Sequence, residues 1–370
     1  MLLVGVMIHR RGCGTARPIK MNEGVLMNLW GENLTRQALL QRIGDIRQLA
    51  GAEAYELSDG NERGVRMVRL YNAAGLEFAV AADRGMCLTR LTFRGIPLAF
   101  INSVGVVHGS YGEATPLGWL RTFMGGFSTI CGLTQVGSPN IDNGEQLGIH
   151  GRAAQIPARN VSFGGAWVEG DQYQVWVEGT LRETAFFGEN LTLKRRVWMN
   201  LDEPRFWIED QVENHGFKST PHMLLQHFNL GFPLVSSTIR LDLGKHTTQP
   251  RDAEAQKGMD EYDVFSDPIP GYQEQVFYHD LQPDEHGQVM VTLANPAFDF
   301  GRGLAVRWRY DRAHYPNLVE WKMMGEGAYV IGIEPANCHV QGRSWERENG
   351  TLRLLNPQET QDYRIEVSFS

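Results

Sequence analysis

The sequence has 370 residues, of which 42% are hydrophobic and 21% are charged, and its formal net charge at pH 7 is −8. This composition is typical of a folded globular chain, and the acidic balance without a cluster of basic and aromatic residues excludes the usual footprint of a nucleic-acid binder. No stretch reaches the roughly 18 uninterrupted apolar residues of a membrane span, and basic residues follow the apolar opening where a signal peptide would place them in front. We therefore expect a cytoplasmic protein with neither a nucleic-acid nor a membrane partner.

Residues 1–52 are predicted to form an N-terminal extension with one short helix. Two interpretations of residues 1–26 stay open, a loose arm or an annotated start that lies too early, because Met21 and Met27 both precede the first structured segment. The helix is predicted from apolar residues on one face of a 3.6-residue period, after candidate caps at Asn33 and Thr35 and before Gly51. These apolar residues are Leu39, Leu40, Ile43, Ile46 and Leu49.

Residues 53–370 are predicted to form a single, mainly antiparallel β domain. Short segments of alternating polarity, separated by Gly, Asn and Asp, replace the helical pattern and predict strands. The clearest are 66–71, 76–80, 88–93, 173–179, 191–199, 205–213, 238–243, 288–293, 304–310 and 329–333. Strands this numerous without alternating helices exclude a doubly wound α/β fold and favour an all-β sandwich or barrel. The polar segment 249–280 is expected to be an irregular insertion or loop.

The sequence lacks the common nucleotide and hydrolase motifs. Neither G-x-x-x-x-G-K-[ST], nor G-x-G-x-x-G between a strand and a helix, nor the G-x-S-x-G elbow occurs. Cys13, Cys87, Cys131 and Cys338 form no C-x-x-C pair, which predicts reduced thiols. Because the histidines form no H-x-H or H-E-x-x-H pattern, we expect no metal.

Two histidines stand in settings that are typical of binding or catalytic residues. His150 and Arg152 belong to the glycine-rich segment 148–152, where glycine lets the backbone approach a ligand closely. His227 shares one face of a predicted strand with Asn229. A structural alternative stays open for each histidine, since His150 could cap a backbone group in a turn and His227 could be a hydrogen-bonded core residue.

A carboxylate and an arginine complete the set of candidate site residues. Glu334 ends an apolar strand directly before Pro335, and partial burial there would raise its pKa toward the range of a general base. A salt-bridged structural glutamate is the alternative. Trp119 and Arg121 precede a glycine pair, and an indole with a guanidinium suits a sugar, because the ring stacks on the sugar and the guanidinium donates hydrogen bonds.

These residues, in this order, resemble the aldose 1-epimerase (galactose mutarotase) family, and in particular an uncharacterised bacterial branch of it. The resemblance covers about residues 53–370, and it implies the large antiparallel β supersandwich of that family, here with a short N-terminal helix. The matching pieces are Arg121 before a Gly-rich turn, the step His150-Gly151, the strand His227-Phe228-Asn229-Leu230, Glu274 after a long loop, and Glu334 at the end of a final apolar strand.

The resemblance implies an isomerase that interconverts the α and β anomers of an aldose by ring opening. Glu334 would accept the proton of the anomeric hydroxyl while His227 protonates the ring oxygen, and no cofactor would be needed. Extra arginines could meet an acidic sugar or a sugar phosphate, so simple galactose is not predicted and the sugar stays open. The expected substrate-binding residues are Arg121, His150, Arg152, Asn229, Glu274 and Arg84, with Asp280 as an alternative to Glu274.

Two other functions stay open at this point. The same Trp, Arg and Asn side chains would serve a carbohydrate-binding protein without catalysis. A metal-assisted isomerase or a lyase could instead use His150, His222 and His227. An exposed strand edge would allow a homodimer.

Overall fold

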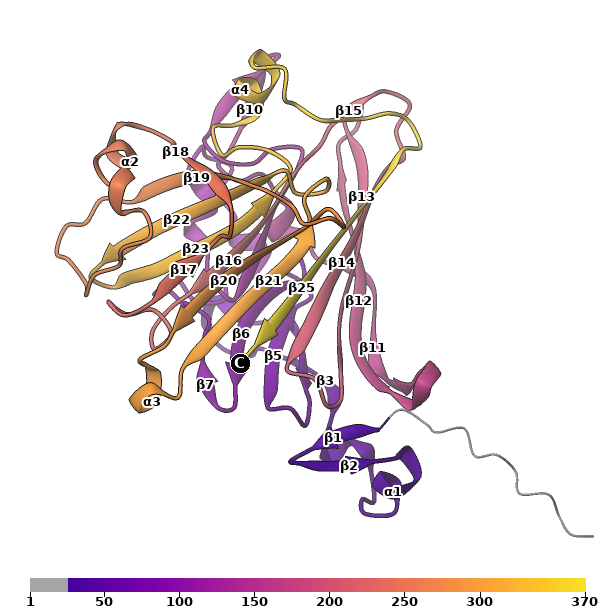
Figure 1. The fold of residues 1–370 in the computed structure, drawn as a ribbon. Helices are drawn as coiled ribbons and strands as arrows, with labels where there is room; N and C mark the ends of the chain where they lie inside the picture. Colours follow the sequence, from indigo (N-terminus) through magenta and orange to yellow (C-terminus); the bar gives the residue numbers. More distant parts are fainter. Residues whose placement is uncertain (1–25) are drawn as a thin grey trace, which may run out of the picture.

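The computed structural model describes residues 26–370, and its main body is a sandwich of two large antiparallel β-sheets (Figure 1). In hydrogen-bonding order, the smaller sheet consists of β11 (Arg159–Trp167), β12 (Tyr173–Thr184), β13 (Asn190–Asn200), β14 (Arg205–Asn214), β25 (Thr360–Phe369), β21 (Leu304–Asp311), β20 (Gln288–Asn295) and β17 (Arg240–Asp242). The larger sheet consists of β18 (His246–Pro250), β19 (Gln275–Leu281), β22 (Asn317–Gly325), β23 (Ala328–Ala336), β16 (Met223–Leu230), β8 (Ser128–Leu133), β6 (Cys87–Phe93), β5 (Leu76–Ala81), β4 (Arg66–Tyr71) and β3 (Gly51–Glu56), with β7 (Ile96–Pro97) beside β6. The predicted all-β sandwich is confirmed.

Short elements surround the two sheets. Small strand pairs are β1 (Met27–Leu29) with β2 (Glu32–Leu34), β9 (Asn140–Asp142) with β10 (Glu145–Leu147), and β15 (Thr220–Pro221) with β24 (Leu354–Leu355). The α-helices of the described residues are α1 (Arg36–Leu40), α2 (Ala253–Lys257), α3 (Phe298–Gly301) and α4 (Arg343–Glu348). The 3-10 helices are η1 (Ile46–Gln48), η2 (Gly60–Glu62), η3 (Gly109–Tyr111), η4 (Gly118–Arg121), η5 (Ala153–Gln155), η6 (Glu169–Asp171) and η7 (Met259–Glu261).

The alternation of polarity along the strands builds the core between the sheets. Along β12, buried and partly exposed residues alternate, as expected for a strand with one face on a core and one toward water. A polar cluster joins the two sheets inside this core. Arg195 on β13 pairs with Asp210 on β14 at 2.6 Å, and Gln226 on β16 accepts a hydrogen bond from Arg195 and donates one to Asp210. Because all three side chains are buried and bonded to one another, their polar atoms are compensated.

The N-terminal helix is shorter than the sequence pattern predicts. Thr35 caps α1 as expected, accepting a hydrogen bond from the backbone N–H of Ala38, but α1 ends at Leu40. Asp45 caps the separate 3-10 helix η1, and Gly51 begins β3 instead of closing a helix. The helix is interrupted because the side chain of Asp45 accepts a hydrogen bond from the backbone N–H of Arg47, and such a local bond competes with a continuous helix.

The segment predicted to be an irregular insertion contains regular structure at both ends. β18 and β19 pair with each other, and α2 and η7 lie between them. The prediction was wrong here because β18 is a short, half-exposed edge strand of polar residues, which carries little alternating signal.

The N-terminal extension packs against the sandwich. Met27, Leu29, Leu34 and Leu39 belong to the same buried cluster as the core between the sheets. The boundary at residue 53 stays a prediction, and the alternatives for residues 1–26 lie almost entirely outside the described residues, as does Cys13. The cysteines Cys87, Cys131 and Cys338 are buried free thiols. From residue 26 onward, no helix has the length and apolar character needed to cross a bilayer.

Candidate active site

The centre of the larger sheet is covered on both faces. All residues of β16 are buried, and because alternate residues of a strand point to opposite faces, they divide into two sets. Leu224 and Phe228 pack in the core between the sheets, whereas Met223 and Leu225 belong to a second apolar cluster on the outer face. His227 follows the second set, so it lies on the outer face of the sheet.

His227 and Glu334 face each other on neighbouring strands. The register that pairs Phe228 with Ile333 sets them opposite, and Nε2 of His227 lies 3.0 Å from Oε1 of Glu334. This contact is not a hydrogen bond, and within the described part of the chain Oε1 of Glu334 and Nδ1 of His227 have no hydrogen-bond partner. Only 5% of His227 and 2% of Glu334 are exposed. Buried polar atoms are rarely left without a partner, so these atoms are available to a ligand.

Burial opposes the charged form of both members of this pair. The pKa of His227 lies well below its usual value, first because of burial and then because of the neighbouring His150. The pKa of Glu334 lies well above its usual value because of burial and the negative charge of Glu274, while Arg251 acts in the opposite direction. Near neutral pH these directions favour a neutral imidazole beside a protonated carboxyl. Apart from the N–H hydrogen of the neutral ring, the pair then holds one titratable proton.

His150 lies beside the pair in a tightly packed turn. The φ angles of His150 and Gly151 are both positive, and a Cβ at Gly151 would lie 2.5 Å from the carbonyl oxygen of Gly132, so only glycine fits there. Nδ1 of His150 accepts a hydrogen bond from the backbone N–H of Gly137 at 3.4 Å, which leaves Nε2 to carry the ring hydrogen. Burial lowers the pKa of His150 to about 4, and its ring centroid lies 5.7 Å from that of His227.

Glu274 is held by two donors at the edge of the same cavity. Nη2 of Arg251 donates to Oε1 at 3.1 Å, and Nε1 of Trp321 donates to Oε2 at 2.8 Å. All three side chains line the cavity that contains His227 and Glu334. The alternative residue Asp280 instead pairs with Arg312 and is mostly exposed, so the structure brings Glu274 to the site and not Asp280.

Aromatic rings form the walls of this cavity, whose volume is about 120 Å³. The ring centroids of Phe123 and Trp321 each lie 5.4 Å from that of His227, and Trp119 stacks on Phe123 at 4.3 Å. Aromatic faces and edges of this kind suit a sugar, whose C–H groups are apolar and whose hydroxyl groups are polar.

The structure does not bring Arg121 into the cavity. The side chain of Arg121 is 75% exposed and lies 3.9 Å from Glu113, because Trp119 and Leu120 are the residues of η4 that face the cavity. A 3-10 helix has about three residues per turn, so the three positions cannot all face the same side.

Asn229 and Arg84 do not line the cavity, because their side chains donate hydrogen bonds to backbone carbonyl groups. The Asn229 amide is buried and donates hydrogen bonds to the carbonyl oxygens of Gly126 at 3.0 Å and of His227 at 2.9 Å, so it supports the glycine turn and the strand. Arg84 is buried as well. Its guanidinium donates to the backbone carbonyls of Ala154, Val107 and Thr122.

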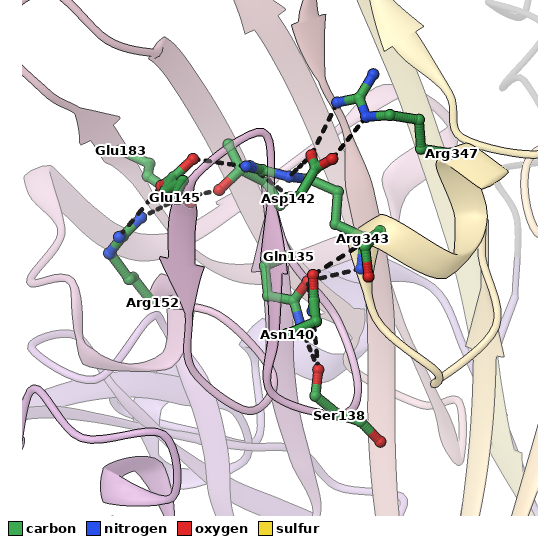
Figure 2. A network of polar contacts seen from close by, with 11 residues as sticks. Gln135, Ser138, Asn140, Asp142, Glu145, Arg152, Glu183, Arg343 and Arg347 are labelled. Carbon is green, nitrogen blue, oxygen red and sulfur yellow. Dashed lines mark hydrogen bonds and ion pairs between the residues drawn. The ribbon is translucent and has the colours of Figure 1, made fainter.

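Arg152 lies in a second cavity beside the first one. This cavity has a volume of about 280 Å³, and Trp119 and Ile149 line both cavities. Figure 2 shows Arg152 facing Glu145 and Glu183, with N to O distances of 3.5 Å to each.

An ion-pair network holds the chain segment that carries His150. Asp142 on β9 accepts hydrogen bonds from Nε of Arg343 and Nε of Arg347, both on α4 and both at 2.7 Å (Figure 2). The backbone N–H of Arg343 donates to Oε1 of Gln135 at 2.9 Å. The hairpin of β9 and β10 is therefore tied to the C-terminal helix α4.

The histidines considered for a metal site are not gathered in one place. His222 points to the opposite face of β16 from His227, where its ring contacts the hydroxyl of Tyr363 at 2.7 Å and the carbonyl oxygen of Leu133 at 3.2 Å. Over residues 26–370, no group of three or more His, Cys, Asp or Glu side chains is arranged to hold a metal ion.

Among the cavity residues that were not identified as site residues from the sequence are Arg251, Phe123 and Trp321. Arg251 follows the unrecognised edge strand β18, Phe123 follows η4, and Trp321 was placed on a scaffold strand. The strand register brings Trp321 beside Glu334, because Trp321 pairs with Gly332, two residues before Glu334. A Cβ at Gly332 would lie 2.5 Å from Oε1 of Glu334 and 2.8 Å from Cβ of Trp321, so glycine leaves the room that both side chains occupy.

Solved structures define the class of this fold. It is similar to a candidate aldose 1-epimerase from Klebsiella pneumoniae subsp. pneumoniae, with a TM-score of 0.82, 22% identity, and coverage of 91% of this chain and 86% of that chain. It is also similar to a galactose mutarotase-like protein from Clostridium acetobutylicum, with a TM-score of 0.58, 14% identity, and coverage of 87% and 99%. The protein therefore has the galactose mutarotase-like β-sandwich fold.

The family follows from the sequence. A family model described as a domain of unknown function, DUF4432, matches residues 62–369, and the chain belongs to this family. No curated protein matches the sequence.

Proposed function

We propose that the protein is an aldose 1-epimerase-like enzyme, which interconverts the α and β anomers of an aldose. The observation that carries the proposal is the contact of 3.0 Å between His227 and Glu334 on the floor of a cavity with aromatic walls. O1 and O5 of a cyclic aldose are both bonded to C1, so an acid and a base that serve them must lie close together. A directly opposed cross-strand pair meets this requirement.

The reaction needs one proton acceptor and one proton donor at the same time. As one group takes the proton of the O1 hydroxyl, the C1–O5 bond breaks and the other group gives a proton to O5. Rotation about C1–C2 then presents the other face of the aldehyde, and reclosure moves both protons back. The fold similarity to the candidate aldose 1-epimerase supports a scaffold suited to this chemistry.

The pair holds one proton in total, and either partner can carry it when the sugar binds. The family resemblance assigns the base to Glu334 and the acid to His227. The pKa directions of the free protein favour the reverse, with the proton on Glu334. Both assignments use the same number of protons, and a bound hydroxyl that donates to the carboxylate would move the proton toward the imidazole.

The binding roles follow the geometry of the cavity. Glu274 accepts and Arg251 donates, so together they suit adjacent sugar hydroxyl groups, which can do both. Trp321 and Phe123 provide the apolar wall, and the neutral His150 contributes a ring N–H.

The proposal is tested with Glu334→Gln and a matched control. Glu334→Gln keeps the shape of the side chain but cannot accept a proton, so it should lower the catalysed rate of anomer exchange by a factor of about 100 or more. Glu320→Gln is the control. Glu320 is also buried and lies 3.0 Å from a histidine, His279, but it faces the opposite side of its strand from Trp321.

Exchange is measured by polarimetry or by exchange NMR over a panel of reducing sugars. The proposal expects wild-type protein and Glu320→Gln to accelerate exchange alike and Glu334→Gln to have lost the acceleration. Equal rates for wild-type protein and Glu334→Gln would contradict it. So would tight sugar binding by the wild type without any acceleration, which is the behaviour of a binding protein without catalysis.

A further inference from the structure

The second cavity is larger than the cavity of the acid/base pair and directly beside it. Its volume is about 280 Å³ against about 120 Å³, and Trp119 and Ile149 form part of the wall of both. Loop residues 112–116 line one side, and residues 146–149, 151 and 152 line another. The smaller cavity suits a single sugar ring at the acid/base pair. The larger cavity has no role in the proposed reaction.

Arg152 presents hydrogen-bond donors to the second cavity. Its side chain is 50% exposed and lies among three carboxyl groups, at 3.5 Å from Glu145, 3.5 Å from Glu183 and 3.7 Å from Glu189. These contacts are longer than good charge-assisted hydrogen bonds. Across residues 26–370, no group accepts a hydrogen bond from this guanidinium, whereas the guanidinium of Arg343 bonds Asp142 at 2.7 Å.

The charges around Arg152 favour a neutral ligand with hydroxyl groups. An anionic group that approached the guanidinium would also approach three carboxyl groups, which would repel it. A hydroxyl group can accept from the guanidinium and donate to a carboxylate at the same time. Gln146 and Gln155 also line this cavity and offer both donors and acceptors.

We infer that the second cavity is a subsite for a neutral sugar unit joined to the reacting sugar, so that the substrate class is a reducing disaccharide or longer oligosaccharide. This inference rests on the proposed function, since the reducing end must lie at His227 and Glu334. The joined unit contacts Arg152 and the edge of Trp119. Binding energy from this remote unit raises the catalytic efficiency at the reacting centre.

The test fills the second cavity without touching the first. Gly148 lines the second cavity only, it lacks a positive φ, and a Cβ there would meet nothing closer than the carbonyl oxygen of Thr115 at 3.5 Å. Gly148→Leu is therefore compatible with the backbone and occupies the space of the joined sugar. Gly44→Leu is the matched control, because Gly44 is exposed and a Cβ there would meet no atom within 4 Å.

Exchange rates are compared for glucose and galactose and for the reducing disaccharides cellobiose, maltose, lactose and melibiose. We expect wild-type protein to have a kcat/KM for at least one disaccharide on the order of tenfold above that for its reducing monosaccharide, because the joined unit adds hydrogen bonds in the second cavity. Gly148→Leu should abolish this preference and keep the rate with the monosaccharide, and Gly44→Leu should change neither. Arg152→Lys, which keeps the charge but loses the planar fork, should reduce the preference in part.

The possible failures are distinguishable. If wild-type protein accelerates monosaccharide exchange but no disaccharide is preferred, or if Gly148→Leu leaves the preference unchanged, the subsite is overturned and the proposed function stands. If wild-type protein accelerates the exchange neither of these sugars nor of any other sugar in the panel that tests the proposed function, the proposed function itself fails.

Discussion

The side chains around the acid/base pair set its proton content. His150, His227 and Glu334 are all buried, and burial shifts each pKa toward the uncharged form. The pair therefore gains a second proton only at a pH well below 6.5, and it loses its remaining proton only at a pH well above 4.5. Between these limits one proton is present, which is the state that a coupled acid and base require.

A change at Glu274 should move the alkaline limit of this range. The negative charge of Glu274 raises the pKa of Glu334, whereas Arg251 lowers it. Glu274→Gln removes the negative charge and leaves the arginine, so the pKa of Glu334 should fall and the alkaline limb of kcat/KM should move to lower pH. The measurement is the pH dependence of the catalysed exchange rate.

The control for this prediction is Glu285→Gln, whose side chain is 86% exposed. It should leave the pH profile unchanged. An alkaline limb that stays in place, or moves to higher pH, in Glu274→Gln would show that Glu334 does not determine that limb.

Sequence information was sufficient for some site residues and not for others. His227, Glu334 and His150 stand out because polar side chains interrupt apolar or glycine-rich segments, whereas Glu274 was assigned through the family resemblance. The structure places all four around one cavity. Arg251 has no such local signal, because an arginine after a polar edge strand is common on protein surfaces. Its place in the site depends on which strands pair, which the residues alone do not state.

At the scale of elements, the segment from β8 to β10 depends on α4. Asp142 is 3% exposed and receives hydrogen bonds from two arginines of that helix, and the same segment continues into His150. The pKa of Asp142 is lowered by Arg347 and Arg343, so its stabilising effect is present above its usual pKa near 3.8 and is lost as the pH falls below that value.

Asp142→Asn should therefore weaken both stability and the site. Removing one member of a buried ion pair leaves the other charges uncompensated, and we expect the free energy of unfolding at pH 7 to fall by about 2 kcal/mol. KM should rise more than kcat falls, because the loop that holds His150 loses its attachment. Urea denaturation and exchange kinetics measure the two effects.

A surface ion pair provides the comparison for this variant. Asp280 is 67% exposed and pairs with Arg312, so Asp280→Asn should change the free energy of unfolding by less than about 1 kcal/mol. If Asp142→Asn is no more destabilising than Asp280→Asn, the network in Figure 2 does not hold the segment.

Strands in which buried and exposed residues alternate were predictable from the sequence. Elements whose burial or length depends on neighbouring parts of the structure were not. The predicted segments 66–71 and 205–213 agree with β4 and β14 to within one residue at each end, because one face of each is buried and the alternation is clear. β8 shows no alternation, since all of its residues are buried on both faces of the sheet. Its neighbours within the sheet are β16 and β6. The apolar face of residues 39–49 suits a helix, but Asp45 offers the backbone a competing cap.

At the scale of the whole molecule, one pair of central strands serves both the core and the site. Phe228 and Ile333 point into the core between the sheets, while the neighbouring residues His227 and Glu334 point outward into the cavity. The acid/base pair therefore stands on strands that are covered on both faces, and packing of this kind holds catalytic groups in a fixed geometry. The fold is similar to those of the two solved structures at 14–22% identity, so this arrangement of sheets is compatible with very different sequences.

The proposed function requires that the anomeric carbon of a sugar is bound at His227 and Glu334. The most direct test is a crystal structure of the Glu334→Gln variant soaked with the aldose that the wild-type protein converts fastest. Our account predicts O1 and O5 within hydrogen-bonding distance, about 2.6–3.2 Å, of the side chains at positions 227 and 334, with the sugar against the aromatic wall. A sugar bound in this cavity with its anomeric carbon turned away from both side chains, or bound only elsewhere on the protein, would contradict the account.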